Sequence, residues 1–213
     1  MFRRSEVKFQ GRFSDRKGLF PDRTGFAAGA NFVADYQTQI WYIDFLDTWM
    51  TTDKTHCLNI WDIERESKVA TITSPKFKSN IISVVPLDVL KLVAVVSLDK
   101  IVTIWDFKRK MIVVELDLTQ GGIHTVVWSA SYHVLITAGY ENNINLWTIN
   151  PNFLDITLQG KLIGHSTMVT AVQVVEKTPM VVSADDQGHI KVWDIRNLNC
   201  VQTLNLGLKS AIN

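Results

Sequence analysis

Short runs of alternating hydrophobic and polar residues recur along this chain at a regular interval. Residues 189–195, HIKVWDI, alternate in the way that places apolar side chains on one face of a strand. Similar segments, NIWDI, TIWDF and NLWTI, occupy residues 59–63, 103–107 and 145–149. Their tryptophans follow one another at intervals of 44, 42 and 46 residues. They are Trp61, Trp105, Trp147 and Trp193. An interval of this size predicts four copies of a structural repeat.

Other apolar positions keep a fixed distance from the tryptophan. Twelve to nine residues before it lie the segments 49–52, 93–96, 135–138 and 181–184. Apolar residues also stand eight and eleven residues after it in every copy except the third. The runs are rich in valine, isoleucine and threonine, and turn-forming segments such as SADDQG separate them. This pattern predicts four antiparallel strands in each copy.

A unit of about 40 to 45 residues with four strands and a terminal Trp-Asp resembles a blade of the WD-repeat β-propeller family. The resemblance covers residues 38–206 and implies an all-β fold. The four expected blades lie at approximately 38–78, 79–120, 121–164 and 165–207, within a domain at 38–213. Residues 1–37 form a basic arm that can supply a strand to an incomplete blade. Because the family usually has more blades, we expect part of a larger or incomplete propeller; a closed four-bladed ring is the alternative.

The resemblance also implies a hydrogen-bond network inside each blade. In the family, the tryptophan N–H bonds a Ser or Thr, which bonds a His, and an Asp in a turn closes the network. The fourth copy comes closest with Trp193, Ser183 and His165, but Gln187 stands where the Asp is expected. Either Asp185 or Asp186 is the expected substitute.

The other copies keep parts of this network. The third offers Trp147, Thr137 and Glu141, and the first offers Trp61, Thr51 and Asp53. The second offers Trp105 and Asp99, with Val95 in place of the hydroxyl. The aspartates that follow three of the tryptophans are further expected structural residues: Asp62, Asp106 and Asp194.

Chemically reactive constellations are scarce in this sequence. It contains no Gly-rich phosphate loop, no G-x-S-x-G and no pair of histidines at helical spacing. We therefore predict a protein that is not an enzyme and binds no metal or cofactor. The acidic turn 185–188 is expected to be a tight turn with Gly188 at positive φ. Cys57 and Cys200 lack metal-ligand spacing and are predicted to be small buried hydrophobic residues.

Charge is distributed unevenly, although the net charge is only +1. Residues 1–23 contain seven Lys and Arg against three Asp and Glu, together with four phenylalanines. Such an arm can bind RNA through phosphate contacts and base stacking. The favoured interpretation is an arm that packs its phenylalanines on a blade or partner, so nucleic acid is not an expected partner. Arg3 and Arg4 are candidate partner-binding residues.

Two other segments are candidates for partner contacts. The third copy carries an inserted loop, NPNFL at 150–154, in which Pro151 and Phe153 can anchor a partner. The segment Trp193–Arg196 resembles the W-D-x-R ending by which some WD-repeat proteins dock onto cullin-type ubiquitin ligases, which makes Arg196 a candidate.

The whole pattern predicts a protein–protein interaction scaffold in the cytoplasm. The fourth copy resembles repeats in large WD-repeat proteins of motile cilia, so a ciliary or cytoskeletal assembly is the expected setting. Expected partners are other proteins, including another copy or a chain that completes the propeller. No membrane is expected, because Pro86, Asp88 and Lys91 interrupt the most apolar stretch, 81–96. The alternatives are an RNA-associated propeller and a ubiquitin-ligase substrate receptor.

Overall fold

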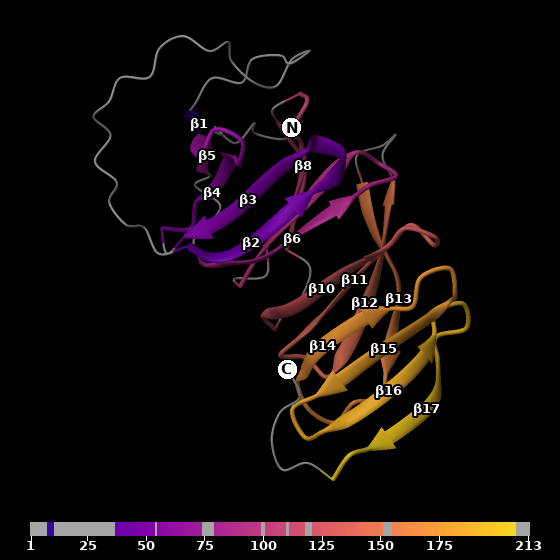
Figure 1. Cartoon of the computed structure of the whole chain (residues 1–213). Coiled ribbons are helices and arrows are strands. Elements are labelled where there is room, and N and C mark those ends of the chain that lie inside the picture. The colour runs from indigo at the N-terminus through magenta and orange to yellow at the C-terminus, as the bar shows by residue number, and fades with distance from the viewer. Residues whose placement is uncertain are drawn as a thin grey trace. The chain divides into compact units, whose positions relative to one another are not determined.

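Strands make up nearly all the regular structure of this protein (Figure 1). The computed structural model describes residues 8–10, 37–53, 55–73, 79–98, 101–109, 111–117, 121–150 and 155–207. Within these residues the one helical element is η1, a single 3-10 turn at Asp44–Leu46. The all-β fold class predicted from the alternating sequence pattern is therefore confirmed.

The strands form four antiparallel sheets, and the four strands of each blade follow one another across the sheet in chain order. Blade 1 contains β2 (Gln37–Ile43), β3 (Thr48–Asp53), β4 (Leu58–Asp62) and β5 (Ser67–Thr73). Blade 2 contains β6 (Ile81–Leu87), β7 (Leu92–Ser97), β8 (Ile101–Asp106) and β9 (Met111–Asp117). Blade 3 contains β10 (Ile123–Ser129), β11 (Val134–Gly139), β12 (Asn143–Asn150) and β13 (Asp155–Ile163). Blade 4 contains β14 (Val169–Val174), β15 (Met180–Asp185), β16 (His189–Asp194) and β17 (Asn199–Asn205).

The N-terminal arm contributes a fifth strand to blade 1. Strand β1 (Lys8–Gln10) pairs antiparallel with β5, with Lys8 opposite Thr73 and Gln10 opposite Thr71. It therefore extends the outer edge of this sheet. The other residues of the predicted arm at 1–37, apart from Gln37 at the start of β2, lie outside the described residues.

The chain divides into two compact units, Met1–Ile81 and Ile82–Asn213. Blade 1 lies in the first unit, and the second unit contains blades 3 and 4 together with all of blade 2 except its first residue, Ile81. In Figure 1 the strands of blade 4, coloured orange to yellow, lie side by side as one twisted sheet.

Each strand that carries an apolar run is buried on both faces, which explains why these runs are continuous rather than strictly alternating. Strand β7 is buried at all six positions, and so is β11. Successive residues of a strand point to opposite faces, so each blade presents two distinct apolar surfaces. We name the two surfaces by the positions of their residues relative to the tryptophan of the blade. The tryptophan face consists of the tryptophan and of the residues that stand 19 and 12 positions before it and 2 positions after it. The following face consists of the residues that stand 13, 11, 9, 3 and 1 positions before the tryptophan.

Blades 2 and 3 pack through these two surfaces. The following face of blade 2 and the tryptophan face of blade 3 belong to one buried apolar cluster. Blade 2 contributes Leu92, Ala94, Val96, Val102 and Ile104. Blade 3 contributes Trp128, Leu135, Trp147 and Ile149. The apolar register that the sequence shows is thus the register of the contact between blades.

Blades 3 and 4 repeat the same arrangement. The following face of blade 3 supplies Val134, Ile136, Ala138, Ile144 and Leu146. The tryptophan face of blade 4 supplies Val174, Val181, Trp193 and Ile195 to the same cluster. Strand β14 contacts both β10 and β11, which brings the first strand of blade 4 against blade 3.

Truncating one of these interblade residues should destabilise the second unit. We expect Ile136→Ala to lower the free energy of unfolding by about 2 to 5 kcal/mol, because Ile136 is fully buried between blades 3 and 4 and the change leaves a cavity. The matched control, Ile163→Ala, removes the same atoms from an exposed position and should change stability by about 0.5 kcal/mol or less. Chemical denaturation of both variants measures the difference, and equal midpoints would contradict the packing described above.

Candidate functional site

The tryptophan N–H finds a hydroxyl acceptor at the same place in three blades. Nε1 of Trp193 donates to Ser183 Oγ at 2.7 Å, and that of Trp147 donates to Thr137 Oγ1 at 2.9 Å. In blade 1, Trp61 Nε1 donates to Thr51 Oγ1 at 2.7 Å. The hydroxyl residue stands ten positions before the tryptophan each time. Because an even separation keeps it on the tryptophan side of the sheet, the pairing of the second and third strands brings it beside the indole.

In blade 2 a hydroxyl also accepts the tryptophan N–H, but it comes from another position in the sequence. Val95 occupies the usual hydroxyl position, and Trp105 Nε1 donates instead to Thr103 Oγ1 at 2.7 Å. Thr103 lies on the same strand as the indole, two residues earlier, and its hydroxyl also donates to the Val95 carbonyl oxygen at 3.2 Å. Thr103 was not predicted from the sequence, because a threonine two positions before the tryptophan on the same strand face has no distinctive spacing. Asp99, the other expected residue of this blade, lies outside the described residues.

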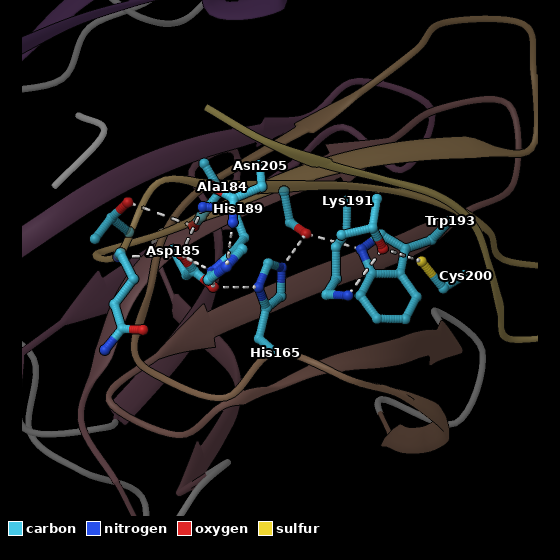
Figure 2. A network of polar contacts seen from close by, with 12 residues as sticks. His165, Ala184, Asp185, His189, Lys191, Trp193, Cys200 and Asn205 are labelled. Atoms are coloured by element: carbon cyan, nitrogen blue, oxygen red, sulfur yellow. Dashed lines mark hydrogen bonds and ion pairs between the residues drawn. The ribbon is translucent and has the colours of Figure 1, made fainter. Parts of the chain in front are cut away.

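The network of blade 4 joins four side chains in one line (Figure 2). His165 stands at its centre: Nε2 lies 2.6 Å from Ser183 Oγ, and Nδ1 lies 2.9 Å from Asp185 Oδ2. Trp193 Nε1 donates to the same Ser183 oxygen from the other side. Figure 2 shows the His165 ring between Asp185 and Trp193, with dashed contacts running along this line. The Ser183 and His165 side chains are almost completely buried.

Proton positions follow from the donors and acceptors available. Indole Nε1 can only donate, so the Ser183 oxygen accepts there, and its own O–H is then free to donate to His165 Nε2. The ionised Asp185 carboxylate can only accept, so Nδ1 carries the proton that it donates there, and in the neutral ring Nε2 is unprotonated and accepts the Ser183 O–H. A neutral imidazole in this tautomer satisfies all four groups. Adding a second proton to the ring would take the acceptor away from the Ser183 O–H.

Asp185, rather than Asp186, is the carboxylate that closes this network, and Gln187 takes no part in it through its side chain among the described residues. Its Oδ1 accepts the backbone N–H groups of Gln187 and His189 at 3.1 and 2.9 Å. The turn that follows it places Gly188 at a φ of 83°. The predicted tight turn with glycine at positive φ is therefore present. Burial opposes ionisation of Asp185, but the backbone N–H of His189 and the His165 ring outweigh it and hold the pKa of the carboxyl below its ordinary value.

Asp53 makes the same turn in blade 1. Its Oδ1 accepts the backbone N–H groups two and four residues further on, those of Thr55 and Cys57. Burial again opposes ionisation, and the hydrogen bonds from Thr55 and Asn59 lower the pKa of the Asp53 carboxyl despite it. No histidine completes the line here; Asn59 Nδ2 donates to Asp53 Oδ2 at 2.9 Å.

The Ser183, His165 and Asp185 contacts have the same atom order as the triad of serine hydrolases. What differs is access. Ser183 is 1% exposed and His165 3% exposed, and the indole N–H of Trp193 occupies the serine oxygen. A nucleophile must approach a carbonyl carbon, and this oxygen lies inside the contact between blades 3 and 4. The arrangement is thus suited to fixing the position of Trp193.

The aspartates that follow the tryptophans close the next turn. Asp62 Oδ1 accepts the backbone N–H of Arg65 at 3.1 Å, and Asp106 Oδ1 accepts that of Arg109 at 3.0 Å. Glu141 serves the other end of blade 3, where its Oε1 accepts the backbone N–H of Gly121 at 3.0 Å.

In blade 4, Asp194 holds Arg196 more tightly than the corresponding pairs. The Arg196 backbone N–H and Nε both donate to Asp194 Oδ1 at 3.0 Å, and Nη2 donates to Oδ2 at 2.6 Å. These Arg196 hydrogen bonds lower the pKa of the Asp194 carboxyl. The Arg196 side chain remains largely exposed on the turn between β16 and β17.

Four sequence-based candidates, Arg3, Arg4, Pro151 and Phe153, lie outside the described residues. Cys57 is partly exposed, and Cys200 is exposed. The prediction that Cys200 is buried was wrong, because β17 is the outer strand of blade 4 and is exposed along its whole length.

Metal-ligating clusters and membrane-spanning helices are both absent from the described residues. In that part of the chain, no group of three His, Cys, Asp or Glu side chains is placed to hold a metal ion. None of its helices has the length and hydropathy that crossing a membrane would require.

A groove of about 320 Å³ lies on blade 1, at the end where Trp61 stands. Tyr42 and Trp49 form one wall, with ring centroids 5.0 Å apart, and the Tyr42 hydroxyl donates to Asp47 Oδ1 at 2.9 Å. Trp61 and Ile63 complete the apolar part. The lining also includes Asp62, the last residue of β4, and Glu64 and Arg65 of the turn that follows. This groove could not be predicted from sequence, because its members look like ordinary strand and turn residues.

Comparison with known proteins supports the resemblance drawn from the repeat. Residues 156–194, which contain the blade 4 network, match the family described as WD domain, G-beta repeat. Cilia- and flagella-associated protein 337 B of Tetrahymena thermophila is 28% identical over 129 residues, covering 59% of this chain and 10% of that protein.

Two other relatives come from different settings. Mitochondrial division protein 1 of Saccharomyces cerevisiae is 25% identical over 130 residues, covering 54% of this chain and 18% of that protein. Transcriptional corepressor LEUNIG_HOMOLOG of Arabidopsis thaliana is 27% identical over 159 residues, covering 73% of this chain and 19% of that protein. The matched regions thus span between a tenth and a fifth of these relatives.

Acid should weaken the blade 4 network. Burial lowers the pKa of His165 below its ordinary value of 6.5, although the Asp185 carboxylate acts in the opposite direction. Below pH 6.5 the unfolded chain therefore binds a proton here that the folded chain does not, and the free energy of unfolding should fall as the pH falls. Denaturation from about pH 7.5 to about pH 5.5 measures the slope, and His165→Gln should flatten it. An unchanged slope in the variant would assign the effect to other groups.

The substitute acceptor in blade 2 allows a test by exchange. Thr103→Val removes the hydroxyl at 2.7 Å from the buried Trp105 N–H and should lower the free energy of unfolding by about 1 to 3 kcal/mol. Adding Val95→Thr places a hydroxyl where blades 1, 3 and 4 have theirs, so the double variant should recover most of the loss. Chemical denaturation of the single and double variants checks this. A double variant no more stable than Thr103→Val alone would show that the position ten residues before the tryptophan is not equivalent in blade 2.

Proposed function

From the WD-repeat blades of this chain we infer that it is a non-enzymatic scaffold for protein–protein interactions, and a structural component of a ciliary or cytoskeletal assembly in the cytoplasm. The observation that carries the inference is the blade 4 network. Its serine, histidine and aspartate, the groups best suited to chemistry, are buried and hydrogen-bonded in support of Trp193. A fold whose reactive groups are used for rigidity is best suited to present surfaces and turns to partners.

The ciliary setting rests on resemblance. The fourth repeat is similar to repeats of large WD-repeat proteins of motile cilia, and one relative is a cilia- and flagella-associated protein. The relatives named for mitochondrial division and transcriptional corepression show that the blades alone do not determine location. The setting is therefore tested separately from the scaffold role.

A chemical probe tests the scaffold role. A fluorophosphonate labels serines that are accessible and activated by a neighbouring histidine. We expect no labelling of Ser183 in the native chain, because its oxygen is buried and accepts the Trp193 N–H. Mass spectrometry of the treated protein identifies any labelled serine, and a known serine hydrolase in the same reaction is the control. Labelling of Ser183 that disappears in His165→Gln would contradict a non-enzymatic role.

Fractionation tests the ciliary setting. The full-length protein carrying a fluorescent tag, expressed in ciliated cells, should remain with the axonemes after detergent extraction, and the tag alone should be released. A tagged protein found only in the detergent-soluble fraction, or excluded from cilia, would remove the ciliary part of the proposal and leave the scaffold part standing.

A further inference from the structure

We propose that His189 and Asn205 form a proton-operated switch that controls the end of strand β17. When the His189 ring gains a second proton, the Asn205 side-chain amide turns over and releases the backbone N–H of Gly207. The inference goes beyond the scaffold function and does not depend on it. It rests on contacts inside blade 4, among β15, β16 and β17, and on which of their atoms can donate or accept a hydrogen bond.

One side of the His189 ring faces the Asp185 carboxylate (Figure 2). Its Nδ1 lies 3.3 Å from Oδ1 and 3.2 Å from Oδ2, and the backbone N–H of His189 donates to Oδ1 at 2.9 Å. The Asp185 carboxyl is ionised, since its hydrogen bonds outweigh the effect of burial and keep its pKa below the ordinary value. An ionised carboxylate can only accept. His189 Nδ1 therefore carries a proton, as His165 Nδ1 does on the same carboxylate.

The other side of the ring faces Asn205. Asn205 Oδ1 accepts the backbone N–H of Gly207 at 2.9 Å, which fixes the orientation of the amide, because a backbone N–H cannot accept. The NH₂ group of the amide, Nδ2, is then the atom that lies 3.4 Å from His189 Nε2. An amide NH₂ group donates, so Nε2 accepts there and is unprotonated. His189 is therefore a neutral ring with both of its nitrogens matched to their partners.

A second proton on the ring reverses this match. The Nε2–H of His189 and the NH₂ group of Asn205 would then be two donors that face each other. Turning the amide over places Oδ1 against Nε2–H, and a hydrogen bond from a charged donor is roughly twice as strong as a neutral one. The same movement places the NH₂ group against the Gly207 N–H, which loses its acceptor. Protonation of His189 thus removes a hydrogen bond at the end of β17.

Gly207 stands just beyond the outer strand of blade 4. The bond from its N–H to Asn205 Oδ1 closes a turn in which an asparagine side chain binds the backbone two residues further on. Gly207 has a positive φ of 63°, and the backbone N–H of Leu206 donates to the Gly188 carbonyl oxygen at 3.2 Å. Protonation should therefore loosen the residues after Asn205 and leave the pairing of β16 with β17 in place.

Charged groups on the neighbouring elements determine how readily the ring takes this proton. Asp185 at the end of β15 favours it, and Asp186 follows in the same turn. Lys191, two residues along β16, opposes it, and so does His165 when that ring is charged. Strand β17 carries no charged residue. The His189 side chain is 28% exposed, so a proton can reach it from water, whereas the His165 side chain is buried.

Nuclear magnetic resonance of the 213-residue chain, from about pH 8 to about pH 5, tests the switch, because histidine rings change charge in this range. At the upper end we expect the ring ¹⁵N signals of His189 to show a proton on Nδ1 and none on Nε2. As the pH falls, Nε2 should gain its proton. The Asn205 side-chain amide and the Gly207 backbone amide should shift with the same midpoint.

Two matched variants separate the switch from a general effect of charge. Asn205→Asp offers an acceptor to the protonated ring and another to Gly207, so the midpoint of the His189 titration should rise by about 0.5 to 1 pH unit and the Gly207 amide should shift less. Asn197→Asp adds the same charge before the other end of β17, where Asn197 Oδ1 likewise accepts the N–H of the residue two positions on. This control should leave the midpoint unchanged. Both asparagines are exposed, and circular dichroism establishes that the variants fold.

Three results would overturn the proposal: a proton on Nε2 rather than Nδ1 of His189 at the upper pH, amide signals of Asn205 and Gly207 that do not follow the His189 titration, or equal midpoints in the two aspartate variants. Amide signals that follow the titration of His165 instead would also overturn it, because the proton would then act through the buried network. The wild-type measurement decides the matter even where a variant does not fold.

Discussion

Face-to-face packing of apolar sheet surfaces is the constraint on which the rest of this structure depends. A four-stranded sheet with apolar residues on both sides cannot be stable alone in water, and each blade of the second unit meets this requirement through its neighbour. The tryptophan contributes the largest single side chain to each contact, and its indole N–H must have an acceptor there. The hydroxyls of Ser183, Thr137 and Thr103 satisfy this need from within the blade. The hydroxyl acceptors in these blades are therefore needed because the apolar packing buries the indole N–H groups.

Much of this fold could be predicted from sequence, because the packing constraint acts at fixed positions. The register of apolar residues predicted the four sheets, and the strands occupy the predicted segments. The hydroxyls ten residues before the tryptophan could also be found, since strand pairing fixes their place. Thr103 could not, because a same-strand neighbour on the same face serves equally well and leaves no distinctive spacing. The exposure of Cys200 was missed for a different reason: an outer strand keeps the alternating composition of an inner one, and only its neighbours determine its burial.

The blades keep the polar network to different degrees. Blade 4 combines Trp193, Ser183, His165 and Asp185, and the family match falls on residues 156–194. Blade 2 lacks the hydroxyl at the usual position, yet it buries its following face as completely as blade 3 does. The apolar surfaces of blades 2 and 3 are therefore packed together without that hydroxyl.

Strand β1 has a consequence for the behaviour of the chain at a sheet edge. An outer strand exposes a row of unpaired backbone N–H and C=O groups, which is a template for pairing with any extended segment. On blade 1 the chain's own Lys8–Gln10 occupies that row along β5. On blade 4 the outer strand β17 pairs, within the described residues, with β16 alone, and its side chains are exposed throughout. Blade 1 and blade 4 therefore differ in the openness of their outer edges to strand addition. An extended peptide should find backbone partners along β17, as along the outer strands β9 and β13, which also pair with one neighbour each among the described residues.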